Sequence, residues 1–234
     1  MPDNYILVVG AHCGDMEISA GMVLAKLART GKRPVFLHLT PGEKGHKTLD
    51  PETYAAQKRE EAQRAAAAFG GEALFLPYRD GELPSDETVK FQIADIIRAV
   101  KPKVVLAHWT GSMHKDHTAA GEVMPDALFY AAIRGFEREL PPHGGVRLLY
   151  TENWEDPIGF RPELYMEVEE QDLERWEAAC KEYALFAGGV SDFDYITYYK
   201  SLARVRGLEI MSPTGLAQCF GLTDLSRRRR VSDI

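Results

Sequence analysis

The sequence predicts an α/β fold in which a mainly parallel sheet is covered by helices on both faces. Short apolar runs alternate with amphipathic segments through most of the 234 residues, which is the pattern of successive βαβ units. The first run starts at Tyr5 and is continuously apolar, as expected of a strand buried on both faces of a parallel sheet. A second such run covers Lys103–His108.

The individual elements follow from periodicity and from start and stop residues. Met16–Thr30 has apolar residues at helical spacing and is followed by Gly31, a typical helix-ending residue. Ser85 precedes acidic residues suited to a first helical turn, and Pro125 is expected to break or kink a later helix. The further strands are predicted at 33–40, 73–77, 147–153 and 163–168, and the further helices at 51–69, 85–100, 118–139 and 171–186.

Length and composition favour one domain, residues 1–234, with a less regular part from about residue 140. The net charge of -7 argues against a nucleic-acid partner. The three cysteines form no C-x-x-C pair, so we expect no disulfide framework and a cytoplasmic location. No apolar run approaches about 18 residues and no signal-type segment is present, so neither secretion nor a membrane span is expected.

The sequence does not decide the role of two segments. The aromatic stretch Phe193–Tyr199 suits a subunit interface as well as a core, which leaves a homo-oligomer open. The run Arg227–Arg230 suits a solvated tail as well as a contact with a subunit or a polyanion.

Histidines and aspartates follow both buried strands. His12 and Asp15 come after the first strand, and His114, Asp116 and His117 come after the strand that ends near residue 108. Ligands of open α/β sheets bind outside the carboxyl ends of the strands. Two histidines and one aspartate are the three protein ligands that a catalytic zinc site uses, with a fourth position left for water. The sequence therefore predicts one metal site.

Two motifs carry a family resemblance. Ala11-His-Cys-Gly-Asp-Met-Glu-Ile-Ser-Ala-Gly21 resembles the Ala-His-Pro-Asp-Asp-x-Glu-x-Gly-x-Gly signature of the LmbE-like (PIG-L) zinc de-N-acetylases. His114-Lys-Asp-His-Thr-Ala-Ala-Gly121 is similar to their His-x-Asp-His-x-x-x-Gly signature. Similarity covers most of the first 125 residues and implies a Rossmann-like three-layer sandwich.

The resemblance also implies a chemistry. Zn²⁺, with another divalent metal left open, would be bound by His12, Asp15 and His117, and water activated by the metal would attack an amide carbonyl. The substrate would be a small N-acylated amino sugar, of N-acetylglucosamine type, or a related amide. His114 matches the histidine that protonates and stabilises the oxyanion, and Asp116 is expected to hold an imidazole, that of His114 being the first choice.

One position departs from the family pattern. Gly14 stands where the family has the aspartate that acts as general base, and Cys13 replaces the preceding proline. The base typically contributes about 10² to 10⁴-fold in rate, and Asp116 and Glu43 are the carboxylates considered as substitutes. Glycine at 14 is also expected to widen the pocket. Cys13 is interpreted as a packed thiol in preference to a metal ligand or nucleophile.

Glu43 and Lys44 lie in a glycine-rich loop after the strand 33–40 and are predicted to bind substrate, with a solvated turn as the alternative. Asp80 fits an ordinary Asp-Gly turn. The preferred function is a zinc-dependent de-N-acetylase. The alternative is a catalytically weakened relative that binds metal or sugar. Nucleotide binding is disfavoured because the turn after the first strand lacks the Gly-x-Gly-x-x-Gly and Gly-Lys-Ser/Thr patterns.

Overall fold

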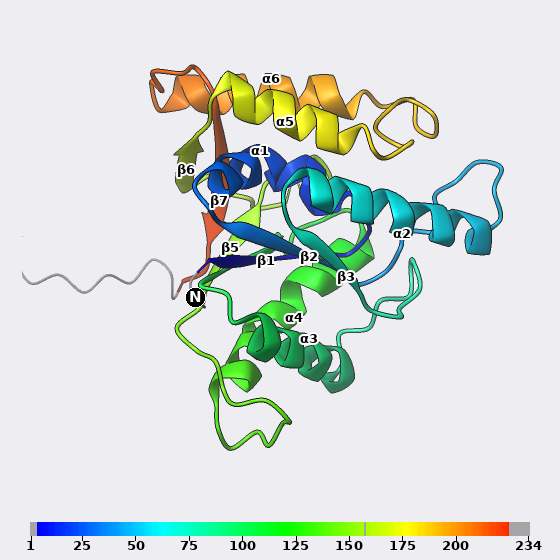
Figure 1. Ribbon diagram of the computed structural model, residues 1–234, viewed down its shortest axis with the longest axis vertical. Coiled ribbons are helices and arrows are strands. Elements are labelled where there is room, and N and C mark those ends of the chain that lie inside the picture. Colours follow the sequence, from blue (N-terminus) through cyan, green and yellow to red (C-terminus); the bar gives the residue numbers. More distant parts are fainter. Residues whose placement is uncertain (1–3, 157, 225–234) are drawn as a thin grey trace, which may run out of the picture.

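The computed structural model describes residues 4–156 and 158–224, and their strands join one mixed sheet in the order β3-β2-β1-β4-β5-β7-β6 (Figure 1). The strands are β1 (Tyr5–Gly10), β2 (Arg33–His38), β3 (Glu72–Phe75), β4 (Val104–His108), β5 (Arg147–Thr151), β6 (Leu164–Glu167) and β7 (Ala217–Leu222). The helices are α1 (Asp15–Arg29), α2 (Pro51–Ala68), α3 (Glu87–Val100), α4 (Lys115–Ala132), α5 (Glu170–Cys180) and α6 (Tyr195–Glu209).

The centre of the sheet is parallel and buried on both faces. β1 pairs in parallel with β2 and with β4, and β4 pairs in parallel with β5. Along β1, Ile6 and Val8 belong to one apolar core and Leu7 and Val9 belong to the other, because successive side chains of a strand point to opposite faces. The run is therefore continuously apolar because both faces of β1 are buried, each in its own core.

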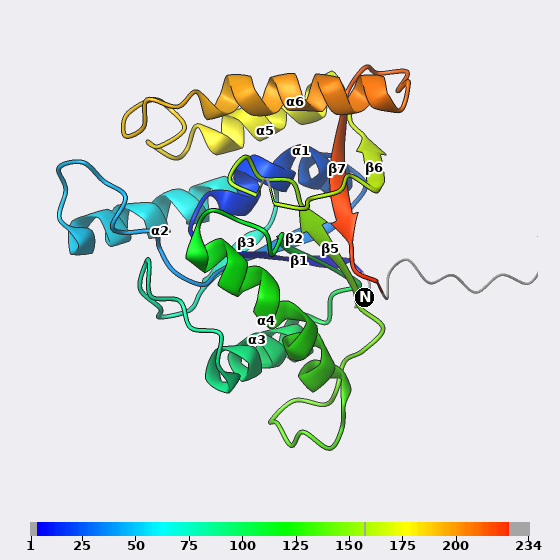
Figure 2. The same ribbon diagram turned by 180° about the vertical axis from the view of Figure 1, so that it is seen from behind.

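Helices cover both faces of the sheet (Figure 2). The helices α3 and α4 pack on one face, and α1 and α2 cover the other, with α5 and α6 lying outside α1. Gly21 allows the close approach of α1 and α5, since a Cβ atom there would lie 2.5 Å from Cδ1 of the Trp176 ring. The predicted α/β class with a mainly parallel sheet and helices on both faces is confirmed.

The structure corrects several element boundaries. The helix α4 begins at Lys115 instead of 118, so Asp116 and His117 lie in its first turn. It continues through Pro125 to Ala132, so of the expected break or kink the break is wrong, because packing against α3 and β4 holds the helix across the proline. No helix was predicted at 195–209 and no strand at 217–222, where α6 and β7 form.

The part of the chain after residue 140 completes the sheet. The strand β7 pairs antiparallel with β5 and with β6, so strands from both halves of the sequence share one sheet, which supports the single domain that we propose. Tyr199 is buried in the core, whereas Tyr198 is partly exposed. Arg227–Arg230 lie outside the described residues. None of the described helices combines the length and the apolar character needed to cross a membrane.

Candidate metal centre

The carboxyl ends of β1 and β4 bring the predicted ligands together. His12 and Asp15 follow β1 directly, and His114 and His117 follow β4, its neighbour in the sheet. The chain order reverses between these two strands, since β2 and β3 lie on one side of β1 and β5 lies beyond β4. Such a switch point is the usual binding site of an open α/β sheet.

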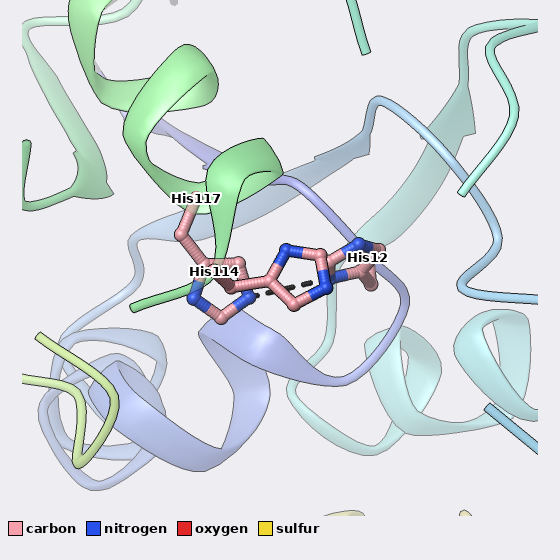
Figure 3. Close-up of side chains that lie close together, drawn as sticks. All are labelled: His12, His114 and His117. Atoms are coloured by element: carbon pink, nitrogen blue, oxygen red, sulfur yellow. Dashed lines mark hydrogen bonds between the residues drawn. The ribbon is translucent and has the colours of Figure 1, made fainter. Parts of the chain in front are cut away.

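Three donor atoms form a nearly equilateral triangle. His12 Nδ1 lies 3.3 Å from Asp15 Oδ2 and 3.2 Å from His117 Nε2, and His117 Nε2 lies 3.4 Å from Asp15 Oδ2. Neighbouring ligands of a tetrahedral ion with bonds of about 2.0–2.1 Å are about 3.3–3.4 Å apart. The three side chains therefore fit one divalent cation, and Figure 3 shows the two imidazoles with that of His114 beside them.

Local backbone structure fixes these donors. Gly14 has φ +105°, a left-handed conformation that turns the chain between β1 and α1. Asp15 begins α1, and its Oδ2 accepts a hydrogen bond of 2.7 Å from the backbone amide of His12. His114 is the N-cap of α4, where its Nδ1 accepts from the amide of Asp116. His117 follows in the first turn of α4.

Two carboxylates hold the far side of the His12 ring. Its Nε2 lies 3.4 Å from Asp116 Oδ2 and 3.2 Å from Asp80 Oδ1. Asp116 is fully buried, and its oxygens accept from the amides of Gly81 and Leu83. A carboxylate on the second nitrogen fixes the tautomer and orientation of a ligating histidine. Asp116 thus contacts an imidazole as expected, but it is that of His12 and not that of His114.

The other two ligand side chains are also supported. His117 Nδ1 lies 3.4 Å from Glu155 Oε2 and 3.8 Å from Asp156 Oδ1. His108 Nε2 lies 3.0 Å from Asp15 Oδ2, and the rings of His108 and His117 stack with centroids 4.0 Å apart. Each candidate ligand is therefore oriented by a second polar side chain.

The pKa values of the candidate ligands are shifted because several charged groups are buried close together. Burial alone would lower the pKa of His117, but the Asp15 carboxylate raises it to about 9. Burial opposes the charged form of His12 too, yet Asp15, Asp116 and Asp80 raise its pKa well above the usual range. Burial would raise the pKa of Asp15, whereas the charges of His117 and His12 hold it well below normal. In the metal-free protein, the negative charge of Asp15 is therefore offset by the imidazoles of His12 and His117.

His114 has a different environment. Its pKa is lowered, first by burial and then by the charges of His12 and His117. Its ring centroid lies 4.6 Å from that of His12 and 4.9 Å from that of His117. His114 therefore lies next to the donor triangle, and with His12 and His117 it also forms a group of donor atoms close enough to hold a metal ion.

A cavity of about 500 Å³ opens over these residues, a volume suited to a small molecule. The polar side chains on its lining include His12, Asp15, His114, His117, Asp80, Glu155 and Lys58. The lining also includes the largely apolar side chains of Leu185, Val190, Phe193 and Tyr195. The cavity therefore combines the donor triangle with an apolar surface.

Glu43 and Lys44 are not on the lining of this cavity. The Glu43 carboxylate accepts from the amide of Asp80, and the Lys44 amide donates to Asp80 Oδ2. The Lys44 ammonium pairs with Glu82, 2.6 Å away, toward solvent. Both residues hold the segment that carries Asp80.

Position 14 does not enlarge the cavity, so that expectation is wrong. A Cβ atom there would lie 3.0 Å from the ring atoms Cε2 and Cζ of Phe186 and 3.7 Å from Lys58 Nζ. The space of the missing side chain is thus filled by Phe186. Cys13 is buried, and burial raises the pKa of its thiol well above normal, in agreement with a packed thiol.

Four polar side chains at the site were not predicted from the sequence. His108 is the last residue of β4 and could have been found by its place at the end of a buried strand. Asp80 stands in an Asp-Gly turn, and the sequence alone does not distinguish a turn residue from a site residue there. Glu155 follows β5 in an irregular segment, and Lys58 lies within a helix, so no local pattern indicates either one.

Comparisons with known proteins bear on the family of this chain. Residues 7–128 match the sequence profile of the PIG-L family, GlcNAc-PI de-N-acetylase. The chain is 29% identical over 215 residues to the diacetylchitobiose deacetylase of Thermococcus kodakarensis, covering 81% of this chain and 80% of the relative. It is 25% identical over 224 residues to a 4-oxalmesaconate hydratase of Pseudomonas putida, covering 92% and 84%.

A solved structure of a conserved protein from Thermus thermophilus superposes with a TM-score of 0.82, at 27% identity and 98% coverage of both chains. The profile match spans just over half of the 234 residues and includes both histidine motifs. The resemblance inferred from those motifs is thereby confirmed, and the chain belongs to the PIG-L family.

Proposed function

We propose that the protein is a zinc-dependent hydrolase that removes an acetyl or other acyl group from an N-acetylglucosamine-type amide. The donor triangle of His12 Nδ1, Asp15 Oδ2 and His117 Nε2, with sides of 3.2–3.4 Å, is the observation that carries the proposal. Two imidazoles and one carboxylate are a ligand set that catalytic zinc accepts. Membership of a deacetylase family supplies the reaction class.

The bound metal would polarise the amide carbonyl and lower the pKa of water. His114 lies on the cavity lining, next to the ligands and outside the triangle. Its lowered pKa favours the neutral imidazole, which can accept a proton and then donate it to the departing amine. We therefore assign proton transfer to His114.

Asp116 has a positioning role in this proposal. Its oxygens accept from two backbone amides and face His12 Nε2, so the carboxylate orients a ligand and is not free to deprotonate water. Glu43 is similarly bound to the amide of Asp80. We assign Glu43 and Lys44 an indirect part in substrate binding, through Asp80. With neither carboxylate free, His114 is the group assigned to accept the proton of water, and we expect hydrolysis to be slower than with an aspartate base.

The test is release of acetate from a panel of N-acetylated amino sugars, including N-acetylglucosamine and diacetylchitobiose, by zinc-loaded protein. We expect slow but measurable release that is lost in His117→Ala. The matched control is His143→Ala, because His143 contacts Pro102 O away from the cavity and its loss should leave the rate unchanged. Zinc-loaded protein that releases no acetate from any member of the panel would contradict the proposal.

Hydration of a carbon–carbon double bond is a second candidate function. Gly14 removes the side chain that deacetylation uses as a base, and the hydratase of Pseudomonas putida aligns over 92% of this chain. Loss of ultraviolet absorbance from 4-oxalmesaconate, with no acetate released from the amino sugars, would favour this candidate. Acetate release without any such loss would favour the hydrolase.

A further inference from the structure

A lysine lies buried at the wall of the cavity. Lys58 is on the inward face of α2, together with Tyr54, Ala62 and Ala65, and is only 3% exposed. It nevertheless contributes to the cavity lining. A charged side chain is rarely buried to this degree unless it is paired.

The ammonium group of Lys58 lacks a counterion among residues 4–156 and 158–224. Its Nζ donates to the carbonyl oxygen of Cys13 and lies 5.1 Å and 5.9 Å from the ring centroids of Tyr183 and Tyr54. Glu61, one turn further along α2, accepts through Oε1 from Gln57 and from the amide of Ala184, and its buried Oε2 makes no hydrogen bond within the described residues. A lysine has three N–H donors, so the described structure leaves donors of Lys58 for a ligand.

The lysine is next to the candidate metal centre. Nζ lies 3.7 Å from the place that a Cβ atom of residue 14 would take, between the ligands His12 and Asp15. The absence of a side chain at Gly14 therefore leaves no carboxylate there to neutralise Lys58. The cation faces a cavity whose acidic groups Asp15 and Asp80 are already engaged by His12.

We propose that Lys58 binds a carboxylate group of the substrate beside the metal centre, so that the protein acts on an anionic compound. A substrate carboxylate would supply the missing counterion and would accept hydrogen bonds from the free N–H donors of the ammonium group. The single positive charge of Lys58 balances one carboxylate, whereas a phosphate dianion would retain one negative charge that Lys58 does not balance. The inference rests on the proposed function only in taking this cavity as the substrate site.

The test measures binding, so it does not depend on turnover. Succinate and its neutral diamide, succinamide, are titrated calorimetrically into zinc-loaded wild-type protein and Lys58→Met. We expect the methionine variant to bind succinate about 10-fold or more weakly, the range of a charge-assisted hydrogen bond, with binding of succinamide unchanged. Lys58→Arg, which keeps the charge, should retain most of the affinity for succinate.

Lys47→Met is the matched control, because Lys47 also lines the cavity but is exposed and paired with Asp192 at 3.0 Å. Its affinity for succinate should equal that of the wild type. Equal affinities in wild type and Lys58→Met, or tighter binding of succinamide than of succinate by the wild type, would overturn the inference. Tighter binding of inorganic phosphate than of succinate would overturn the choice of a carboxylate. None of these outcomes depends on deacetylation, which is tested separately by acetate release.

Discussion

Position 14 shows how one residue changes the site without disturbing the metal ligands. Gly14 adopts φ +105° and passes between His12 and Asp15, while Phe186 and Lys58 surround the place of its absent side chain. The neighbourhood is thus packed for glycine. Restoring the family aspartate would require both a strained backbone and the displacement of an aromatic ring.

Gly14→Asp should therefore destabilise the protein, by about 1–3 kcal/mol, because a non-glycine residue is strained at this φ and its Cβ would contact Phe186. Urea unfolding of the metal-free variant measures the change. Gly31→Asp is a control for backbone strain alone, since Gly31 also has positive φ but open space around it. A Gly14→Asp variant as stable as the wild type would refute this account of the packing.

Asp116 allows a prediction about metal affinity. Asp116→Asn keeps the size of the side chain but removes the charge that faces His12 Nε2, so zinc affinity should fall about 10- to 100-fold. Competition with a chromogenic chelator measures the affinity. Asp95→Asn is the control, because Asp95 pairs with Arg138 on the surface and its loss should leave zinc affinity unchanged. Equal affinities in both variants would show that Asp116 does not orient His12.

The residues whose position follows from a strand end could be predicted from the sequence. His12, Asp15 and His117 were predicted because buried strands and two short motifs locate them. The contacts that Asp116, Glu155 and Lys58 make depend on how segments far apart in the sequence pack together. No periodicity of the sequence indicates that packing. The resemblance favours His114 as the partner of Asp116, whereas the fold places the ring of His12 against the Asp116 carboxylate.

At the scale of elements, the packing of α1 against α5 depends on a small residue. A Cβ atom at Gly21 would lie 2.5 Å from Trp176 and 2.9 Å from Phe69. The same α1 begins at Asp15, so this contact also fixes the helix that carries one candidate ligand.

Gly21→Ala should destabilise the protein by about 1–3 kcal/mol, as overpacking of a full core does. Gly135→Ala is the matched control, because a Cβ there would meet nothing closer than 4.0 Å, and its effect should stay within about 0.5 kcal/mol. Thermal and urea unfolding of both variants measure the difference. Similar stabilities for the two variants would contradict the packing between α1 and α5.

The elements that sequence patterns missed owe their structure to tertiary contacts. The strand β7 includes Gln218, whose side chain accepts from the amide of Val23 and donates to the carbonyl of Ser19 in α1. The helix α6 mixes buried Ile196 and Tyr199 with exposed Leu208, so its amphipathic pattern is weak. Strands with strong apolar runs, such as β1 and β4, were in contrast predicted in place.

For the whole molecule, the ionisable side chains at the site make the stability of the fold depend on pH. The His117 pKa is raised to about 9 in the folded metal-free protein, against an ordinary value of 6.5. The protonated ring therefore stabilises the fold fully below about pH 6.5, and this contribution is lost as the pH rises through about 9. His12, with its raised pKa, acts in the same direction.

Metal-free protein should therefore have a lower Tm at pH 9.5 than at pH 6.5, by a few degrees, as measured by differential scanning calorimetry. In Asp15→Asn, the drop should be much smaller because the carboxylate that raises the pKa of His117 is absent. Zinc-loaded protein should not show this drop in Tm either, since ligating imidazoles carry no proton on the bound nitrogen. A Tm that is constant or rises over this range in the metal-free protein would contradict the assignment.

The most direct test of the whole account is the location of a metal ion by anomalous diffraction from crystals of zinc-loaded protein. We predict one zinc ion per chain, about 2.0–2.2 Å from His12 Nδ1, Asp15 Oδ2 and His117 Nε2, the three atoms that already lie 3.2–3.4 Å apart. An anomalous peak bound by other residues, or no peak at this triangle, would contradict the metal centre and the hydrolytic function that depends on it.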